Sequence, residues 1–233
     1  MKFRKSPIVL FSIVLVCYSL TGLAKKQEIP EVSEDGLHLV KDSKMAIVYI
    51  EPGADLAVYK RVMLLTPEVA FKKNWERNLK SQSASKISRV NTKQIKSDLA
   101  REFETMFAET LSSGGYEIVE EAAEDVLLIR PAIVNLDITA PEQHGSGRSN
   151  SYARSAGEMT LYIELFDSET GDLIVKALDR GIDNPNDAGF YTWANASTNT
   201  NAARRILKGW ADILLNALNE AKNAPLVPLP ASE

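Results

Sequence analysis

Residues 157–178, GEMTLYIELFDSETGDLIVKAL, contain the pattern that decides the fold. Apolar and polar side chains alternate along 157–166, as expected of a strand with one buried face. The two faces carry Met159, Leu161, Ile163 and Leu165 on one side and Thr160, Tyr162 and Glu164 on the other. The tract 167–172, DSETGD, is rich in turn residues, and the apolar run 173–178 follows it. The stretch therefore predicts an antiparallel β-hairpin whose polar face meets water.

Four segments before the hairpin have the composition of strands. Apolar runs rich in β-forming residues lie at 45–50 (MAIVYI) and 59–65 (YKRVMLL), and a shorter one lies at 116–119. The segment 125–138 is a long run that contains Pro131. Because proline cannot donate a backbone hydrogen bond, we expect this strand to lie at the sheet edge or to be bulged there.

Two segments have the 3.6-residue periodicity of amphipathic helices. The first begins near Asn91, which forms a capping-box pattern with Gln94, and ends at Gly114-Gly115. Its apolar stripe consists of Ile95, Leu99, Phe103, Met106, Phe107 and Leu111. The second runs from about Thr200 to Lys222, with a stripe of Ala203, Ile206, Leu207, Trp210, Ile213, Leu214, Ala217, Leu218 and Ala221.

The order of these elements predicts an α+β fold. We expect a two-layer sandwich, in which a largely antiparallel sheet of five to six strands carries two amphipathic helices on one face. A single α+β domain would span 45–222, after an irregular leader at 25–44 and before a Pro-rich mobile tail at 223–233.

The first 24 residues have the pattern of a secretory signal peptide. A basic start precedes an apolar stretch from Ile8 to Leu20, and small residues follow at Gly22 and Ala24. We expect cleavage after Ala24, no stable transmembrane span afterwards, and a periplasmic or secreted mature protein. Two alternatives remain open. The stretch is nearly long enough for an uncleaved membrane anchor, and Cys17 could be lipidated, although its neighbour in the chain is valine rather than a small lipobox residue.

Charge and cysteine content exclude some classes of partner. Loss of Lys2, Arg4 and Lys5 with the signal changes the formal charge from −4 to −7, because 24 basic residues then face 31 acidic ones. This acidity disfavours nucleic acid and anionic membrane surfaces as partners. Cys17 is the only cysteine, so the mature domain cannot form a disulfide.

The tract 52–71, PGADLAVYKRVMLLTPEVAF, resembles an uncharacterised family of bacterial envelope proteins described as lipoproteins. The later segments 115–119 (GYEIV) and 125–133 (DVLLIRPAI), followed by a hairpin and a C-terminal helix, are similar to the same family. The likeness extends over roughly residues 36–222. It implies a bacterial source and a place in the cell envelope, and it implies no activity.

No motif in the sequence indicates catalysis, a metal site or a cofactor. His38 and His144 are the only histidines, and neither has the spacing of a zinc site, so we expect solvated loop histidines, no metal and no cofactor. Asp179, Asp183 and Asp187 could be combined with Glu164 into an acid/base pair, but their spacing is not that of a known motif.

The candidate binding surface lies in two long loops. Aromatic residues among asparagines in the 183–199 loop, namely Phe190, Tyr191 and Trp193, could form a flat platform. Arg148 and Arg154 in the 140–156 loop could add charge to it. The alternative is that these aromatic side chains fold back and seal one end of the core.

Three functions follow as hypotheses. The first is a non-enzymatic envelope protein that binds another envelope protein or an envelope component through the exposed sheet face, an edge strand near Pro131 or the long loops. The second is a hydrolase acting on carbohydrate or cell wall, with acidic residues near the 183–199 loop. The third is a carrier that holds a small apolar ligand between the sheet and the helices.

Overall fold

The computed structural model describes residues 28–75, 77, 92–138, 152–153, 157–182, 192–193 and 196–223. The predicted signal peptide at 1–24 and the tail beyond Asn223 lie outside these residues. Within them, no helix combines the length and the apolar composition needed to span a membrane.

The described chain contains one large sheet, a small two-stranded ladder and two long helices. The strands are β1 (His38–Leu39), β2 (Ile47–Ile50), β3 (Arg61–Leu64), β4 (Glu68–Phe71), β5 (Glu117–Ile118), β6 (Val126–Ile138), β7 (Tyr152–Ala153), β8 (Gly157–Asp167), β9 (Leu173–Ile182) and β10 (Thr192–Trp193). The helices are η1 (Leu56–Val58), α3 (Thr92–Ser113) and α4 (Ala196–Asn223). Eight strands form the large sheet in the order β1-β2-β9-β8-β6-β3-β5, with β4 paired to β6, while β7 pairs with β10.

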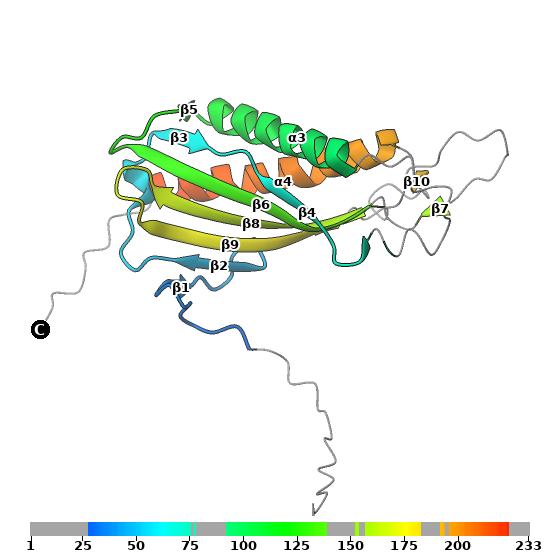
Figure 1. Cartoon of the computed structure of the whole chain (residues 1–233). Helices are drawn as coiled ribbons and strands as arrows, with labels where there is room; N and C mark the ends of the chain where they lie inside the picture. The colour runs from blue at the N-terminus through cyan, green and yellow to red at the C-terminus, as the bar shows by residue number, and fades with distance from the viewer. Residues whose placement is uncertain are drawn as a thin grey trace, which may run out of the picture.

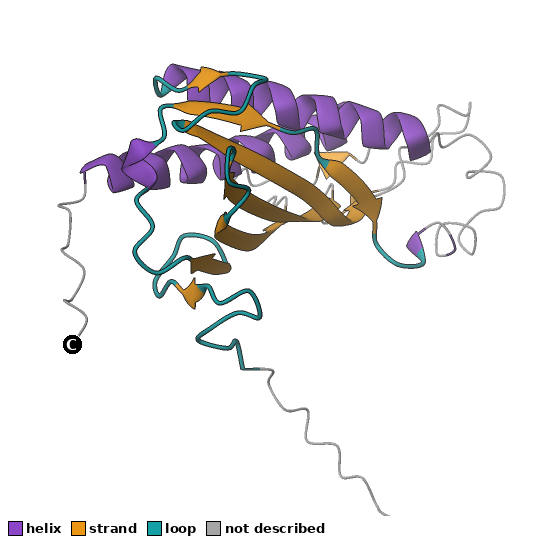
Figure 2. Cartoon of the chain, turned by 60° about the vertical axis from the view of Figure 1, so that its left-hand side comes forward, coloured by secondary structure: helices purple, strands orange, loops and turns teal. Residues whose placement is uncertain are grey.

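Both helices pack on one face of the sheet (Figures 1 and 2), which confirms the predicted α+β class. The predicted hairpin is the antiparallel pair of β8 and β9. The sheet is larger and more mixed than expected, because β3 and β4 run parallel to β6, and β3 runs parallel to β5. The reason is α3, which lies between β4 and β5 in the sequence. It returns the chain to the same end of the sheet, as a crossover connection does, so the strands before and after it run parallel.

Pro131 does not lie at the sheet edge, so this prediction was wrong. Strand β6 is interior, and Pro131 lies opposite Ile163 of β8. On its other flank β3 ends its pairing at Ile129 and β4 begins its pairing at Ala132. The proline thus occupies the junction between two partner strands, where a missing backbone donor interrupts neither ladder. The register of β6 with β8 shifts only further on, between Val134 and Asp137.

The helix layer is fixed by aromatic packing and by one close approach. Phe103 and Phe107 of α3 are fully buried and stacked, with ring centroids 3.9 Å apart. Past the end of α3, a Cβ at Gly114 would lie 2.1 Å from Leu215 Cδ1, so only glycine lets α4 pack this closely. Gly115 has φ 88°, the left-handed conformation expected where this helix ends.

An ion pair also joins the two helices. The Arg204 guanidinium of α4 donates to both carboxylate oxygens of Glu102 in α3, at 2.7 Å each. These hydrogen bonds hold the pKa of Glu102 below its usual value. A bidentate pair fixes orientation as well as distance, so it sets how the helices lie on the sheet.

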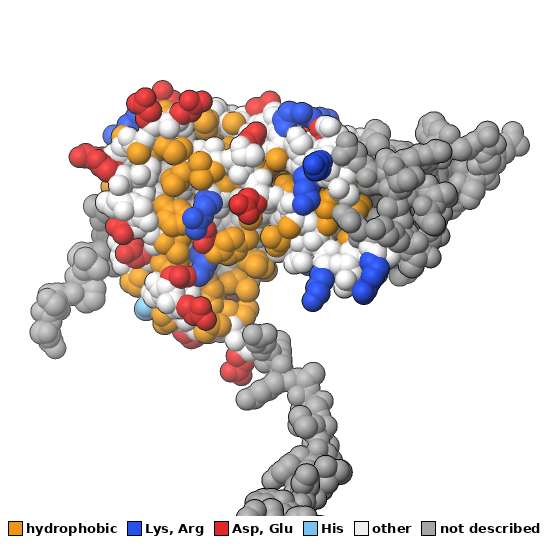
Figure 3. Space-filling model, viewed as in Figure 1, with side chains coloured by type: hydrophobic (Ala, Val, Ile, Leu, Met, Phe, Trp, Pro, Cys, Tyr) orange, Lys and Arg blue, Asp and Glu red, His pale blue; other side chains and the backbone are white. Residues whose placement is uncertain are grey.

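The outer face of the sheet is less exposed than predicted. Thr160 and Glu164, expected to meet water, are each only 8% exposed. Glu164 accepts hydrogen bonds from Arg130 Nε at 2.7 Å and from the Tyr162 hydroxyl at 2.6 Å. Burial, and then the bond to Glu164, raise the pKa of Tyr162. Long neighbouring side chains therefore cover the carboxylate, and Arg130 itself lies 4.6 Å above the Phe166 ring. Figure 3 shows this mixture of apolar and charged side chains on the outer face.

The leader predicted as irregular is ordered where the structure describes it. Strand β1 pairs with β2, and Leu37 beside it is buried. The Tyr49 hydroxyl donates to Pro30 O at 2.9 Å, and Asp35 forms an ion pair with Lys176 on β9. Within residues 30–39, strand β1 (His38–Leu39) departs from the predicted irregular structure, and the segment is attached to the outer side and edge of the sheet.

Candidate ligand-binding groove

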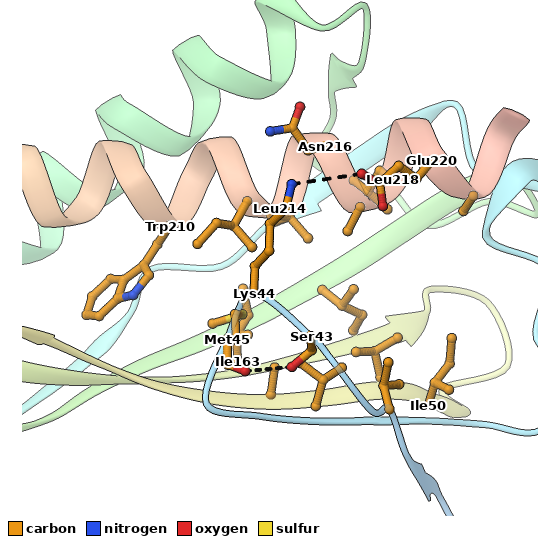
Figure 4. A pocket seen from close by; sticks show the side chains of 18 of the residues that line it. Ser43, Lys44, Met45, Ile50, Ile163, Trp210, Leu214, Asn216, Leu218 and Glu220 are labelled. Carbon is orange, nitrogen blue, oxygen red and sulfur yellow. Dashed lines mark hydrogen bonds and ion pairs between the residues drawn. The ribbon is translucent and has the colours of Figure 1, made fainter.

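An apolar groove of about 380 Å³ lies between α4 and the sheet (Figure 4). Its roof is the inner stripe of α4, made by Trp210, Ile213, Leu214, Ala217, Leu218 and Ala221. Its floor comes from three neighbouring strands through Val48, Ile50, Leu161, Ile163, Leu165, Val175 and Ala177. Phe107 of α3 and Leu56 of η1 complete the walls. The groove is therefore part of the interface between helix and sheet rather than a surface depression.

One end of the groove is closed because α4 lies directly on β9 there. A Cβ at Gly181 would lie 2.2 Å from Ile206 Cγ2 and 2.9 Å from Trp210 Cζ2. Further along α4, the small side chains of Ala217 and Ala221 leave space above the sheet. A glycine at one end and alanines along the helix thus give the groove its shape.

Asp179 holds this closed end together. Its carboxylate accepts hydrogen bonds from Trp210 Nε1 at 2.7 Å and from Ala46 N at 3.0 Å. Three elements meet through this one side chain: α4, β9 and the segment that leads into β2. Asp179 is therefore engaged in the structure.

Polar side chains gather at the mouth of the groove, where the loop of residues 40–45 passes α4. Lys44 extends from this loop toward the helix and forms a loose ion pair with Glu220, at 4.0 Å (Figure 4). Asp42 and Asn216 lie nearby on the two rims. The Ser43 hydroxyl donates to Met45 O at 2.5 Å. Because the Lys44 and Glu220 side chains are mostly exposed, the pair can open at little cost.

The structure does not test the predicted loop surface. Arg148, Arg154, Phe190 and Tyr191 lie outside the described residues. The backbone of Trp193 belongs to β10 and faces that of Tyr152 in β7, so the two long loops do meet at this ladder. Whether the five predicted side chains form a binding surface stays a prediction.

The acidic candidates do not form a catalytic pair among the described residues. Glu164 is bound by Arg130 and Tyr162 on the outer face, whereas Asp179 lies at the groove. Asp183 and Asp187 lie outside the described residues. The described part of the chain contains no group of three or more His, Cys, Asp or Glu side chains that could hold a metal ion.

The sequence suggested a ligand held between the sheet and the helices as one hypothesis but did not locate the groove, although the predicted stripe contains the apolar α4 residues that line it. They were assigned to the core because their periodicity is that of any buried helix face. A signal was present in Ala217 and Ala221, since two small residues one turn apart on an otherwise bulky stripe leave room beneath them.

Comparisons with solved structures find chains of low similarity to this one. The PelC dodecamer from Paraburkholderia phytofirmans is 13% identical, with a TM-score of 0.37, over 72% of this chain and 96% of that one. A "putative lipoprotein" from Caulobacter crescentus CB15 is 11% identical, with a TM-score of 0.36, over 73% and 96%. A DUF4136 family protein from Bacteroides thetaiotaomicron VPI-5482 is 12% identical, with a TM-score of 0.34, over 72% and 94%.

No curated protein matches the sequence. A family profile does match, over residues 32–214, which include every strand of the large sheet and most of α4. That range is far more than half of the chain. The chain therefore belongs to the family described as "Protein of unknown function (DUF3313)".

Proposed function

We propose that this chain is an exported, non-enzymatic binding protein of the bacterial envelope, which holds an apolar ligand in the groove beneath α4. The observation that carries the proposal is a hollow of about 380 Å³ with a mostly apolar lining. Sites for small molecules fall in the range of roughly 300–1,000 Å³ and combine apolar walls with a few polar groups.

The chemistry of the groove indicates the kind of ligand. Side chains such as Ile163, Leu214 and Leu218 offer dispersion contacts and no hydrogen bonds. Polar groups occur only at the mouth, where Lys44 and Glu220 meet. An acyl chain or another apolar portion of an envelope component fits this arrangement, with its polar end at the mouth.

A binding role also agrees with what the polar lining residues do. Ser43 donates its hydroxyl proton to a backbone carbonyl, and Lys44 is paired with Glu220. Among the described lining residues, neither arrangement supplies a nucleophile with an adjacent base. Ligand retention, rather than bond cleavage, is the function that these groups support.

Export is supported by the signal-peptide pattern of residues 1–24. The proposal places the mature protein in the periplasm or outside the cell, with an envelope protein or component as its partner. The mass of the protein isolated from its host tests this directly. A chain that begins at Lys25 is expected, whereas a cytosolic chain that retains Met1 would contradict export.

Ligand binding can be tested with the uncharged fluorophore N-phenylnaphthylamine. The full mature chain should bind it in the groove and enhance its fluorescence. Ala217→Trp places a large ring at the exposed mouth and should abolish the enhancement. Thr105→Trp, at an exposed position of α3 away from the groove, is the matched control and should not.

The same protein, purified from its own host, should carry a retained apolar molecule in native mass spectrometry. Enhancement that survives Ala217→Trp, or protein that neither retains a ligand nor binds the fluorophore, would refute the proposal.

A further inference from the structure

A second hollow lies at the other end of the molecule, where β4 continues into residues 72–77 beside the first turns of α3. It is an open depression of about 650 Å³, lined by the aromatic residues Phe71 and Trp75 and by the cations Lys72, Lys73, Arg77 and Lys96. We call it the basic pocket. It shares no lining residue with the groove.

The aromatic part of the basic pocket is rigidly held. Phe71 and Trp75 are stacked, with ring centroids 4.2 Å apart and planes inclined by 16°. Trp75 is buried, and its Nε1 donates to Ile138 O at 3.1 Å, which ties it to the end of β6. Phe71 is only half-buried, so part of its ring remains available to a ligand.

The cations of the basic pocket differ in how far they are neutralised. Lys72 donates to Asp137 and to Glu158, at 2.9 Å each, and its charge is balanced. Lys96 lies over the Phe71 ring, with Nζ 5.7 Å from the centroid, a cation–π contact. Within the described part of the chain, Lys73, Arg77 and Lys96 have no carboxylate within ion-pair distance.

This concentration of positive charge stands out against the rest of the chain. The whole sequence has a formal charge of −4, yet residues 72–96 contain eight Lys or Arg and one Glu, a net of +7. Figure 3 shows basic side chains at the end of the molecule where β4 lies and acidic ones at the opposite end. Among the described cations, Lys73, Arg77 and Lys96 have no described carboxylate to balance their charge, so the surface around them attracts anions.

We propose that the basic pocket binds a segment of an acidic glycan. A carboxylate or phosphate on a sugar would pair with Lys73, Arg77 and Lys96, and apolar C–H groups of the sugar would contact the part of the Phe71 ring that Trp75 and Lys96 leave exposed. The concave shape of the basic pocket favours a ligand group that fits into it. It is less suited to an extended flat surface that lies across it. The acidic remainder of the chain, including Asp137 and Glu158, which pair with Lys72, would be repelled by an extended anionic membrane.

The test is binding of the full mature chain to oligogalacturonate, measured by calorimetry at low and at moderate salt. We expect binding that weakens as salt is added. The double variant Arg77→Gln/Lys96→Gln should lose about tenfold in affinity, equivalent to about 1.4 kcal/mol. Lys41→Gln/Lys208→Gln removes the same charge from two exposed sites elsewhere and should bind as the wild type does.

Two further measurements distinguish a glycan from free phosphate and from a lipid headgroup as the source of the bound anion. Phe71→Leu should weaken the binding of oligogalacturonate but not that of inorganic phosphate, because phosphate has no sugar ring to contact the side chain. Vesicles of phosphatidylglycerol should bind more weakly than the glycan. Stronger binding to vesicles, binding to phosphate alone, or equal loss in the two double variants would each overturn the proposal.

Discussion

The groove beneath α4 and the basic pocket beside β4 are both hollows of one fold, but they are built differently. The groove is made of side chains from the middle of α4, β8 and β9, whose burial also holds the molecule together. The basic pocket is made of exposed cations where elements begin or end. The comparison teaches that the walls of the groove cannot be changed without a cost in stability, whereas the exposed cations Lys73 and Arg77 of the basic pocket can.

The largest effect should come from a matched pair of phenylalanines. Phe107 is fully buried at the groove, and Phe107→Ala should lower the free energy of unfolding by about 3–5 kcal/mol. Phe71→Ala, at the half-buried ring of the basic pocket, should cost less than half as much. Urea denaturation measures both values, and equal losses would remove the distinction between the two hollows.

A pair of tryptophans should give an intermediate effect. Each donates its indole N–H, Trp210 to the Asp179 carboxylate at 2.7 Å and Trp75 to the Ile138 carbonyl at 3.1 Å. Hydrogen bonds to charged groups contribute about 1.5–3 kcal/mol and neutral ones about 0.5–1.5 kcal/mol. Thermal unfolding should therefore show Trp210→Phe to be the more destabilised variant, and the reverse order would show that Asp179 is not a structural carboxylate.

Acid should destabilise the protein partly through Glu158, which pairs with Lys72 of the basic pocket. Hydrogen bonds from Arg180, and then from Lys72, lower the pKa of this carboxyl. The contribution of Glu158 to the free energy of unfolding is thus present above its pKa in the unfolded chain, about 4.3. It is lost as the pH falls through its pKa in the folded protein. Glu158→Gln should flatten the decline of unfolding free energy between neutral and acid pH, as should Glu102→Gln between the helices. If the curves of unfolding free energy against pH for these variants ran parallel to that of the wild type, the prediction would be contradicted.

The smallest effect should come from Lys44 at the groove mouth. Its ion pair with Glu220 is exposed and 4.0 Å long, and such pairs contribute about 0–1 kcal/mol. Lys44→Ala should leave the melting temperature and N-phenylnaphthylamine affinity almost unchanged, because the apolar walls determine both. A large loss of affinity would show that the mouth, rather than the walls, holds the ligand.

The sequence predicted those parts of the fold whose residues are close together in the chain, namely the hairpin and the two helices. The alternation in 157–166 and the periodicity of the two helices identified the hairpin and both helices, because burial of one face leaves a regular trace in sequence. The parallel pairing of β3 and β4 with β6 left no such trace. It depends on α3 as a crossover, and β4 is too short to show a periodicity.

The functional features were harder to predict because each depends on contacts between distant residues. Glu164 is distinguished from a surface carboxylate only by Arg130 and Tyr162, which lie on it in the folded sheet. Lys96 joins Arg77 in one pocket only because the start of α3 lies beside the end of β4. The basic character of 72–89 was visible in the sequence, but not which of its charges remain unpaired.

The junction at Pro131 has a mechanical consequence. Strand β6 gives one stretch of its flank to β3 and the next to β4, and no ladder bond crosses the proline between them. Strand β4 can therefore separate from β6 without breaking the hydrogen bonds between β3 and β6. Amide hydrogen exchange at Val69 should then be uncoupled from that at Val62. Changes of length or conformation in the segment after β4 would then be absorbed there, while the central strands keep their register.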